Sequence, residues 1–203
     1  MRLHQIVIVP SRGWAGDDGG YCRGNDIGWT SEADLVDLYV SYLADILDQE
    51  GIRHSILGTR KAPGIRAADR HTMIPVNSLV LHCAMGWHRN HIKQDLGANI
   101  SRTFYQLATA YALARDVAEA IGQWGDLTVH GHRCGKPQQD TGDKLLCPDG
   151  SQGIRIEPFL INGPGIQDYA KHMARLGRDI GMAVAEYCRE IQQGVLVRTA
   201  VIR

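Results

Sequence analysis

Short β-branched runs alternate with long amphipathic segments along this chain, and this alternation limits its fold more than any other feature. The runs are short and apolar, as is typical of buried strands, and cover residues 5–9, 53–57, 78–82, 127–132 and 153–157. The helical segments cover residues 31–50, 101–122 and 166–192. We therefore predict an α/β fold of three layers, with helices on both faces of a largely parallel, twisted sheet.

A long polar segment separates the first strand from the first helix. Residues 11–30 are rich in Gly and Asp and predict a loop of a length that is usually functional or mobile. Ser31 is a favoured N-cap residue, Glu32 and Asp34 supply an acidic first turn, and Gly51 ends the helix.

The length and charge of the chain bound its organisation and partners. Its 203 residues predict one domain over residues 1–192 and a strand-like extension over 193–203, which could join the sheet edge of another subunit. Lys plus Arg and Asp plus Glu both total 22, so the formal net charge is zero. We expect neither nucleic acid nor membrane as a partner, because both usually need a basic surface.

The apolar runs also bear on localisation. Residues 6–9 are too short for a signal-peptide core, and nothing approaches the ~20 apolar residues of a membrane span. We expect cytoplasmic synthesis without a signal peptide. The five cysteines favour free thiols, although Cys134 and Cys147 flank a polar segment and could pair.

Polar residues follow the predicted strands where the strands end. Arg12 follows the first strand, His82 ends the third, and Glu157 ends the fifth. Ligands bind outside the carboxyl ends of the strands in open α/β sheets. We therefore expect these residues, with Glu32 at the start of the first helix, to line one cleft.

The order of these motifs resembles the zinc-dependent N-acetylmuramoyl-L-alanine amidases, which cleave the bond between N-acetylmuramic acid and L-alanine in peptidoglycan. The resemblance covers about residues 5 to 190. At the end of the first strand, VPSRGW with Arg12 corresponds to the D-P-G-H-G-G turn of the family. The next matching segments are SEADL with Glu32, the pair Thr59-Arg60, and Arg70. The last are LVLHCAMGW with His82, Gly97-Ala98-Asn99-Ile100, and IEPFLIN with Glu157, Phe159 and Asn162.

This resemblance implies an amidase-like fold and a role for several residues. It makes Glu32 and His82 zinc ligands and Glu157 the general base. Arg70 and Asn162 match motif positions and are candidates for binding substrate. Trp87 could stack on sugar or peptide, or anchor its loop on the core.

Arg12 departs from the family pattern, because a His ligand is expected there. A guanidinium stays protonated and has no lone pair to give, so Arg12 cannot bind zinc. One interpretation is that Arg12 pairs with Glu32 or Glu157 and occupies the metal's space. The other is that a nearby residue replaces the lost ligand. The candidates are Asp17, Asp18, Cys22, Asp26, Cys83 and His88, although Cys83 should point away from His82.

A second cluster lies outside the family pattern. His130, His132 and Cys134 alternate along a predicted strand, so they should share one face, to which Cys147 could return. Two His and two Cys can hold zinc in a tetrahedral site, but the spacing is unusual for one. The alternative is an exposed polar strand beside the cleft.

Three functions follow from these patterns. The first is a peptidoglycan amidase whose zinc site is rearranged or whose catalysis is impaired. The second is a non-catalytic protein that binds cell wall or other protein subunits, as an oligomer or as a virion component in a phage tail or baseplate. The third is a different metal or thiol hydrolase that uses the second cluster.

Overall fold

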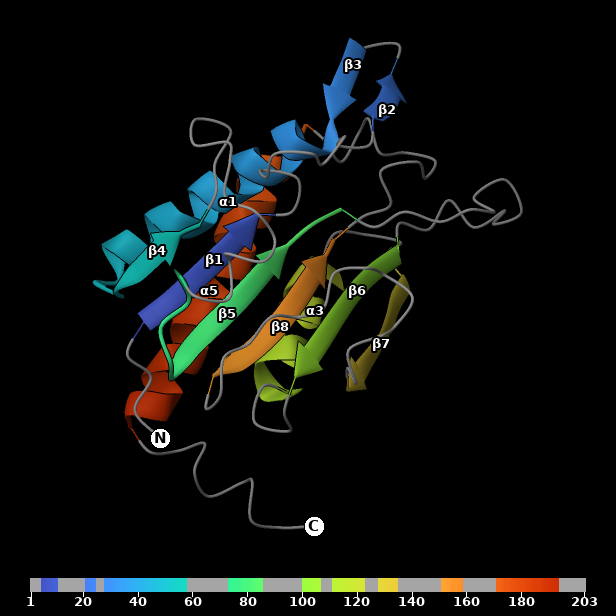
Figure 1. Ribbon diagram of the computed structural model, residues 1–203. Helices are drawn as coiled ribbons and strands as arrows, with labels where there is room; N and C mark the ends of the chain where they lie inside the picture. The colour runs from blue at the N-terminus through green and yellow to red at the C-terminus, as the bar shows by residue number, and fades with distance from the viewer. Residues whose placement is uncertain are drawn as a thin grey trace.

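The computed structural model describes the core elements of this fold. The residues it describes are 5–10, 21–24, 28–57, 73–85, 100–106, 111–122, 128–134, 151–158 and 171–193. Figure 1 labels the elements that they form. In chain order these are β1 (Gln5–Pro10), β2 (Tyr21–Gly24), β3 (Gly28–Ser31), α1 (Glu32–Gln49), β4 (His54–Ile56), β5 (Ser78–Cys83), β6 (Ile100–Gln106), α3 (Tyr111–Gly122), β7 (Thr128–Cys134), β8 (Gln152–Glu157) and α5 (Met173–Gln192).

A six-stranded sheet forms the centre of the molecule, in the order β4-β1-β5-β8-β6-β7 (Figure 1). The strands β4, β1, β5 and β8 are parallel to one another. β6 runs antiparallel to β8, and β7 is parallel to β6. The predicted α/β fold with a largely parallel sheet is confirmed.

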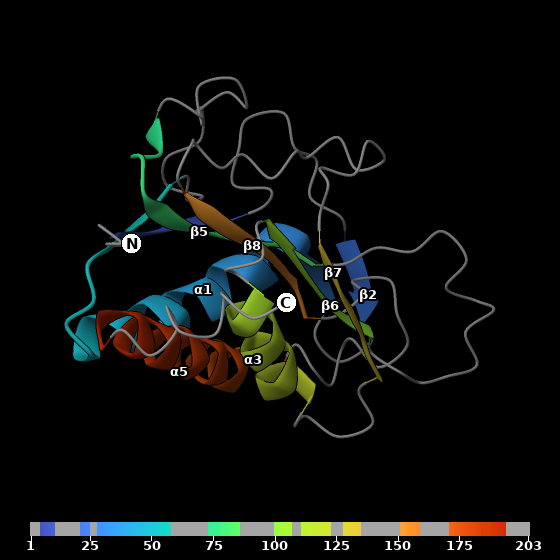
Figure 2. The same cartoon turned by 90° about the horizontal axis from the view of Figure 1, so that it is seen from below.

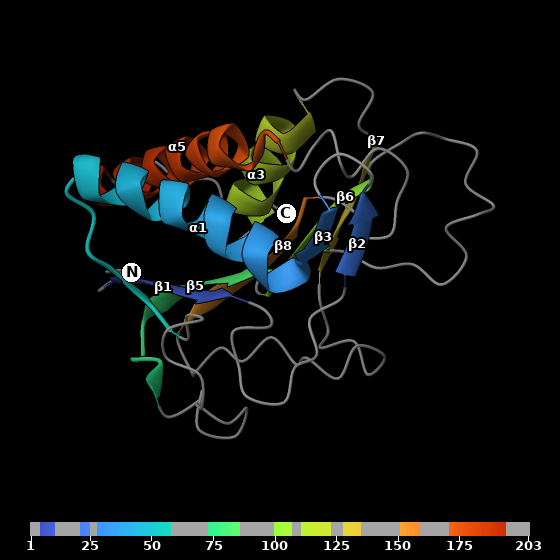
Figure 3. The ribbon, with the colours of Figure 1, turned by 90° about the horizontal axis from the view of Figure 1, so that it is seen from above.

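The long helices α1, α3 and α5 lie on one face of this sheet (Figures 2 and 3). The alternation of β1 matches this arrangement, because Ile6 and Ile8 belong to the core cluster that the helices complete. Val7 and Val9 face the other way and pack with Ile74 and other residues. The remaining chain that would form the predicted second helical layer lies outside the described ranges.

One predicted element was wrong in type. Residues 101–106 belong to strand β6, where we expected the first turns of a helix over residues 101–122, and α3 begins only at Tyr111. The segment ISRTFYQ is rich in β-branched and aromatic residues, which favour strands. Because β8 and β7 pair with it on both sides, the sheet satisfies its backbone groups.

Two element boundaries also differ from the prediction. Part of the loop expected over residues 11–30 forms the antiparallel pair β2 and β3. The final helix was predicted from residue 166, but Lys171 and His172 form a turn and α5 begins at Met173. No helix in the described part of the chain is long and apolar enough to cross a membrane.

Two buried contacts fix the register between β5 and β8. At the start of the strands, the Ser78 backbone N–H donates to Ser151 Oγ at 3.0 Å. Beyond their other end, the Ala84 N–H donates to the Ile156 carbonyl at 3.0 Å. The strands are therefore held at both ends, and this pairing fixes which residues lie side by side on β5 and β8.

Close packing between α1 and α5 depends on two glycines one helical turn apart. A Cβ atom on Gly177 would collide with the backbone carbonyl of Tyr39, and one on Gly181 would lie 2.9 Å from the Ile46 Cβ. Both glycines belong to α5, and Tyr187 joins this helix to the sheet, because its buried hydroxyl donates to Gln152 Oε1 at 2.6 Å. The helix α5 is thus fixed to both α1 and β8.

The glycine contact predicts a specific loss of stability. Gly177→Ala should gain about 1 kcal/mol in helix propensity, but the methyl group would press on backbone that cannot move aside. Overpacking of this kind usually costs about 1–3 kcal/mol, so we expect a net decrease in the free energy of unfolding in urea. Met182→Ala on the same helix is the control, because Met182 is 52% exposed and should change stability by less than about 0.5 kcal/mol. An unchanged Gly177→Ala variant would contradict the packing.

The buried thiol of Cys188 predicts a loss of stability at alkaline pH. Burial raises the pKa of this thiol from 9.0 to about 11. The unfolded chain therefore releases the proton above about pH 9 while the folded chain keeps it, and the stability falls as the pH rises toward 11. The free energy of unfolding in urea should fall between about pH 8 and about pH 10.5 in both proteins. The decrease should be about 1–2 kcal/mol smaller in Cys188→Ala than in the unaltered protein. An equal loss in both proteins would contradict this assignment.

Candidate functional site

His82 lies next to last in β5 and faces away from the helical layer. Its strand neighbours Leu81 and Cys83 are buried, and Leu79, Leu81 and Cys83 belong to the core cluster under the helices. Val80 packs in the cluster on the opposite face. Since side chains alternate along a strand, His82 projects on the same face as Val80.

Arg155 and Glu157 project from β8 on this same face. Ile154 and Ile156 belong to the core under the helices, so the residues between and after them face the other way. The register pairs His82 with Arg155 across the two parallel strands. His82, Arg155 and Glu157 thus form a group at the carboxyl ends of adjacent strands, which we call the strand-end cluster.

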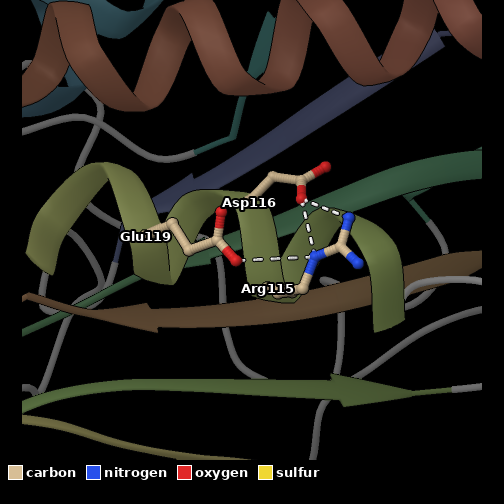
Figure 4. Close-up of polar contacts among 3 residues, drawn as sticks. All are labelled: Arg115, Asp116 and Glu119. Carbon is tan, nitrogen blue, oxygen red and sulfur yellow. Dashed lines mark hydrogen bonds and ion pairs between the residues drawn. The ribbon is translucent and has the colours of Figure 1, made fainter.

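An ion pair joins two members of the strand-end cluster. Arg155 Nε lies 2.7 Å from Glu157 Oε1, and the two side chains are only 16% and 11% exposed. The Arg115 pairs with Asp116 and Glu119 on the surface of α3 are a useful contrast (Figure 4), because the Arg115 side chain is 50% exposed. Solvent screens the α3 pairs, whereas little water reaches the pair on β8.

Arg155 was not predicted as the partner of Glu157. Glu157 was expected at a strand end, with Arg12 as its only candidate counter-ion. The signal was present in GIRIE, because a strand period of two puts Arg155 and Glu157 on one face while Ile154 and Ile156 face the core. Arg12 itself lies outside the described residues, and its pairing stays a prediction.

The cluster predicts a measurable coupling between its two charges. In a double-mutant cycle with Arg155→Leu and Glu157→Gln, we expect a coupling of about 0.5–3 kcal/mol in the free energy of unfolding. The exposed pair Arg115 and Asp116, altered to Leu and Asn, is the matched control and should give less than about 1 kcal/mol. Additive effects on β8 would show that the two side chains do not interact in solution.

Cys83 is excluded as a replacement metal ligand, as its place in the strand predicted. It is fully buried in the core under the helices, on the face opposite His82. Burial raises the pKa of its thiol to about 12, and the hydrogen bond with Tyr39 lowers it only in part. Metal ligation requires the thiolate, so this thiol is unsuited to it.

By themselves, the described residues of the strand-end cluster supply too few ligands for a catalytic zinc ion. A catalytic zinc site needs three protein ligands, and the cluster offers one imidazole and one carboxylate that already pairs with a guanidinium. Among the residues described, no group of three or more His, Cys, Asp or Glu could hold a metal ion. Glu32 begins α1, but its side chain lies outside what the structure describes.

The second predicted cluster falls on β7, which confirms that His130, His132 and Cys134 share a strand. β7 lies at one edge of the sheet, separated from β8 by β6. The β6–β7 register shifts between Ser101 and Thr103, which pair with Val129 and His132. This irregularity interrupts the simple alternation we expected between His130 and His132. The side chains are not described, so the cluster stays a prediction.

Several other predicted residues lie outside the described ranges, so their roles also stay predictions. Among the site residues these are Arg12, Arg70, Trp87, Cys147 and Asn162. The same holds for the candidate replacement ligands Asp17, Asp18, Asp26 and His88. It also holds for residues 194–203 of the predicted strand-like extension. Cys22 lies in β2, where only the backbone is described.

Three solved structures are similar to nearly the whole chain. AmiC2, an N-acetylmuramoyl-L-alanine amidase of Nostoc punctiforme, is 18% identical with a TM-score of 0.65, over 93% of this chain and 97% of its own. The catalytic domain of CwlV, an N-acetylmuramoyl-L-alanine amidase from Bacillus (Paenibacillus) polymyxa var. colistinus, is 13% identical with a TM-score of 0.66, over 93% and 98%. The CwlD amidase from Clostridioides difficile, solved in complex with the GerS lipoprotein, is 18% identical with a TM-score of 0.56, over 95% and 100%.

These likenesses confirm the predicted amidase-like fold. At 13–18% identity they show the fold alone, because one fold can carry different activities. No family model and no curated protein matches the sequence.

Proposed function

We propose that this chain, which has the fold of N-acetylmuramoyl-L-alanine amidases, is a peptidoglycan-binding relative of these enzymes whose zinc-dependent hydrolysis is impaired or lost. The observation that carries the proposal is the ion pair between Arg155 and Glu157, 2.7 Å apart at the end of β8. Glu157 is the residue to which the amidase resemblance gives the role of general base. In this chain its carboxylate has a permanent cation beside it.

The pair weakens Glu157 as a base for two reasons. A general base must reach the proton it removes, within about 2.6–3.2 Å or through one water, and one carboxylate oxygen is already in contact with Arg155 Nε. A proton added to Glu157 would also remove the charge that holds the ion pair. Both effects oppose the proton transfer that amide hydrolysis needs.

The residue at the position of the first metal ligand supports the same proposal. Arg12 stands where the amidase motif has a His, and a guanidinium cannot ligate zinc. Two arginines thus oppose the binding of a divalent cation. They are Arg12, at its motif position in the sequence, and Arg155, in the folded site. Among the described residues, no group of three or more His, Cys, Asp or Glu could hold a metal ion.

Binding to the wall does not need either of the lost functions. In the amidase fold the cleft outside the carboxyl ends of the strands receives the ligand, and His82 and Glu157 mark that edge of the sheet here. We propose that Arg70, Trp87 and Asn162 contribute to the binding of glycan or stem peptide, as their motif positions suggest. The protein would then recognise peptidoglycan without cutting it.

Sedimentation and hydrolysis assays on purified sacculi test the proposed function. We expect the protein to sediment with sacculi and to release no stem peptide, with or without added zinc. Any residual hydrolysis from this site should disappear in Glu157→Gln and persist in Glu119→Gln, a matched change on the exposed surface of α3. Efficient release of stem peptides from muramic acid would refute impaired catalysis, and failure to sediment would refute wall binding.

A further inference from the structure

We infer that Arg155 is the built-in cation of this site and excludes a divalent metal from the strand-end cluster. The inference deepens the proposed function, on which it rests for the meaning of the cleft, by naming the side chain that keeps the metal out. It makes Arg155 a positioning residue that holds Glu157 and takes the place of the ion's charge.

Arg155 lies beside His82, the implied metal ligand, and in contact with Glu157, the implied general base. Its Cα is the register partner of His82 on the neighbouring strand, and its Nε lies against Glu157 Oε1. The Arg155 side chain therefore runs from beside His82 toward Glu157. An ion bound to His82 and close to Glu157 would meet this side chain.

Burial makes the exclusion effective. Both His82 Nε2 and Arg155 Nε are shielded from solvent. Little water therefore screens the repulsion between a guanidinium and a second cation. The arginine guanidinium also stays protonated at any relevant pH, so it cannot lose its charge to make room for a metal. The cation at this point of the site is thus permanent.

A purely structural role for Arg155 makes a different prediction. If Arg155 only stabilised the end of β8, any substitution would lower stability without changing metal affinity. If Arg155 excludes the metal by its charge, neutral replacements should admit zinc while Arg155→Lys should not. The conservative variant therefore separates the two roles.

Zinc affinity, measured by competition with a chromophoric chelator, tests the inference. We expect Arg155→Leu to bind zinc about 10–100-fold more tightly than the unaltered protein, the range typical of residues that surround metal ligands. Arg155→Gln keeps hydrogen-bonding capacity without charge and should show the same direction of change, so it serves if the Leu variant does not fold. Adding His82→Ala to either variant should abolish the gain in zinc affinity. The absorption of bound Co²⁺ should appear in each neutral variant and disappear when His82→Ala is added.

Two controls define the result. Arg155→Lys should stay at the affinity of the unaltered protein because it keeps the charge. Arg115→Leu should also stay there, because it removes an ion-paired arginine from the exposed surface of α3. The inference is overturned if neither neutral variant gains affinity, or if the unaltered protein already binds zinc tightly through His82.

The outcome is independent of the assays on sacculi. A gain of zinc affinity in the neutral variants without any binding to sacculi would leave Arg155 as the cation of the site and refute the proposed function. Binding to sacculi without hydrolysis, together with no gain of affinity, would support the proposed function and refute the role of Arg155.

Discussion

The register between β5 and β8 is the constraint on which the candidate site depends. The two strands are about 70 residues apart in sequence, and buried hydrogen bonds hold them at both ends, from Ser78 N–H to Ser151 Oγ and from Ala84 N–H to the Ile156 carbonyl. A slip of one residue would turn Glu157 into the helical core and bring Ile156 to the cleft face. The burial of Ile154 and Ile156 under the helices opposes such a slip.

The sequence predicted much of this fold because the apolar strands and the long helices carry strong local patterns. β1, β5 and β8 came directly from short β-branched runs, and α1 from its periodic apolar face. β6 was missed because its strand state depends on pairing with β7 and β8, which are distant in the chain. Its β-branched and aromatic residues favour a strand, but its apolar residues also continue the helical spacing of the segment that follows, so Ile100–Gln106 was merged with that helix.

The strand-end positions of His82 and Glu157 were predicted from the sequence, but the ion-pair partner of Glu157 was not. Strand ends located His82 and Glu157, since the carboxyl ends of parallel strands meet at one edge of the sheet. The ion pair follows from strand alternation in GIRIE, which puts Arg155 on the face of Glu157, whereas a motif match identifies Glu157 alone. Arg12 and Trp87 lie outside the described residues, so their roles stay predictions.

The ion pair between Arg155 and Glu157 is a weak source of stability. A buried or nearly buried ion pair usually contributes little net stability over apolar residues of similar size, because desolvation offsets the attraction. The core under the helices and the α1–α5 contact at Gly177 supply cohesion without it. The register and strand alternation bring the Arg155 guanidinium to the Glu157 carboxylate on the face opposite the helices. Because both side chains are largely withdrawn from water, removing either one would leave the other charge without its partner, and this would cost more than the pair itself contributes.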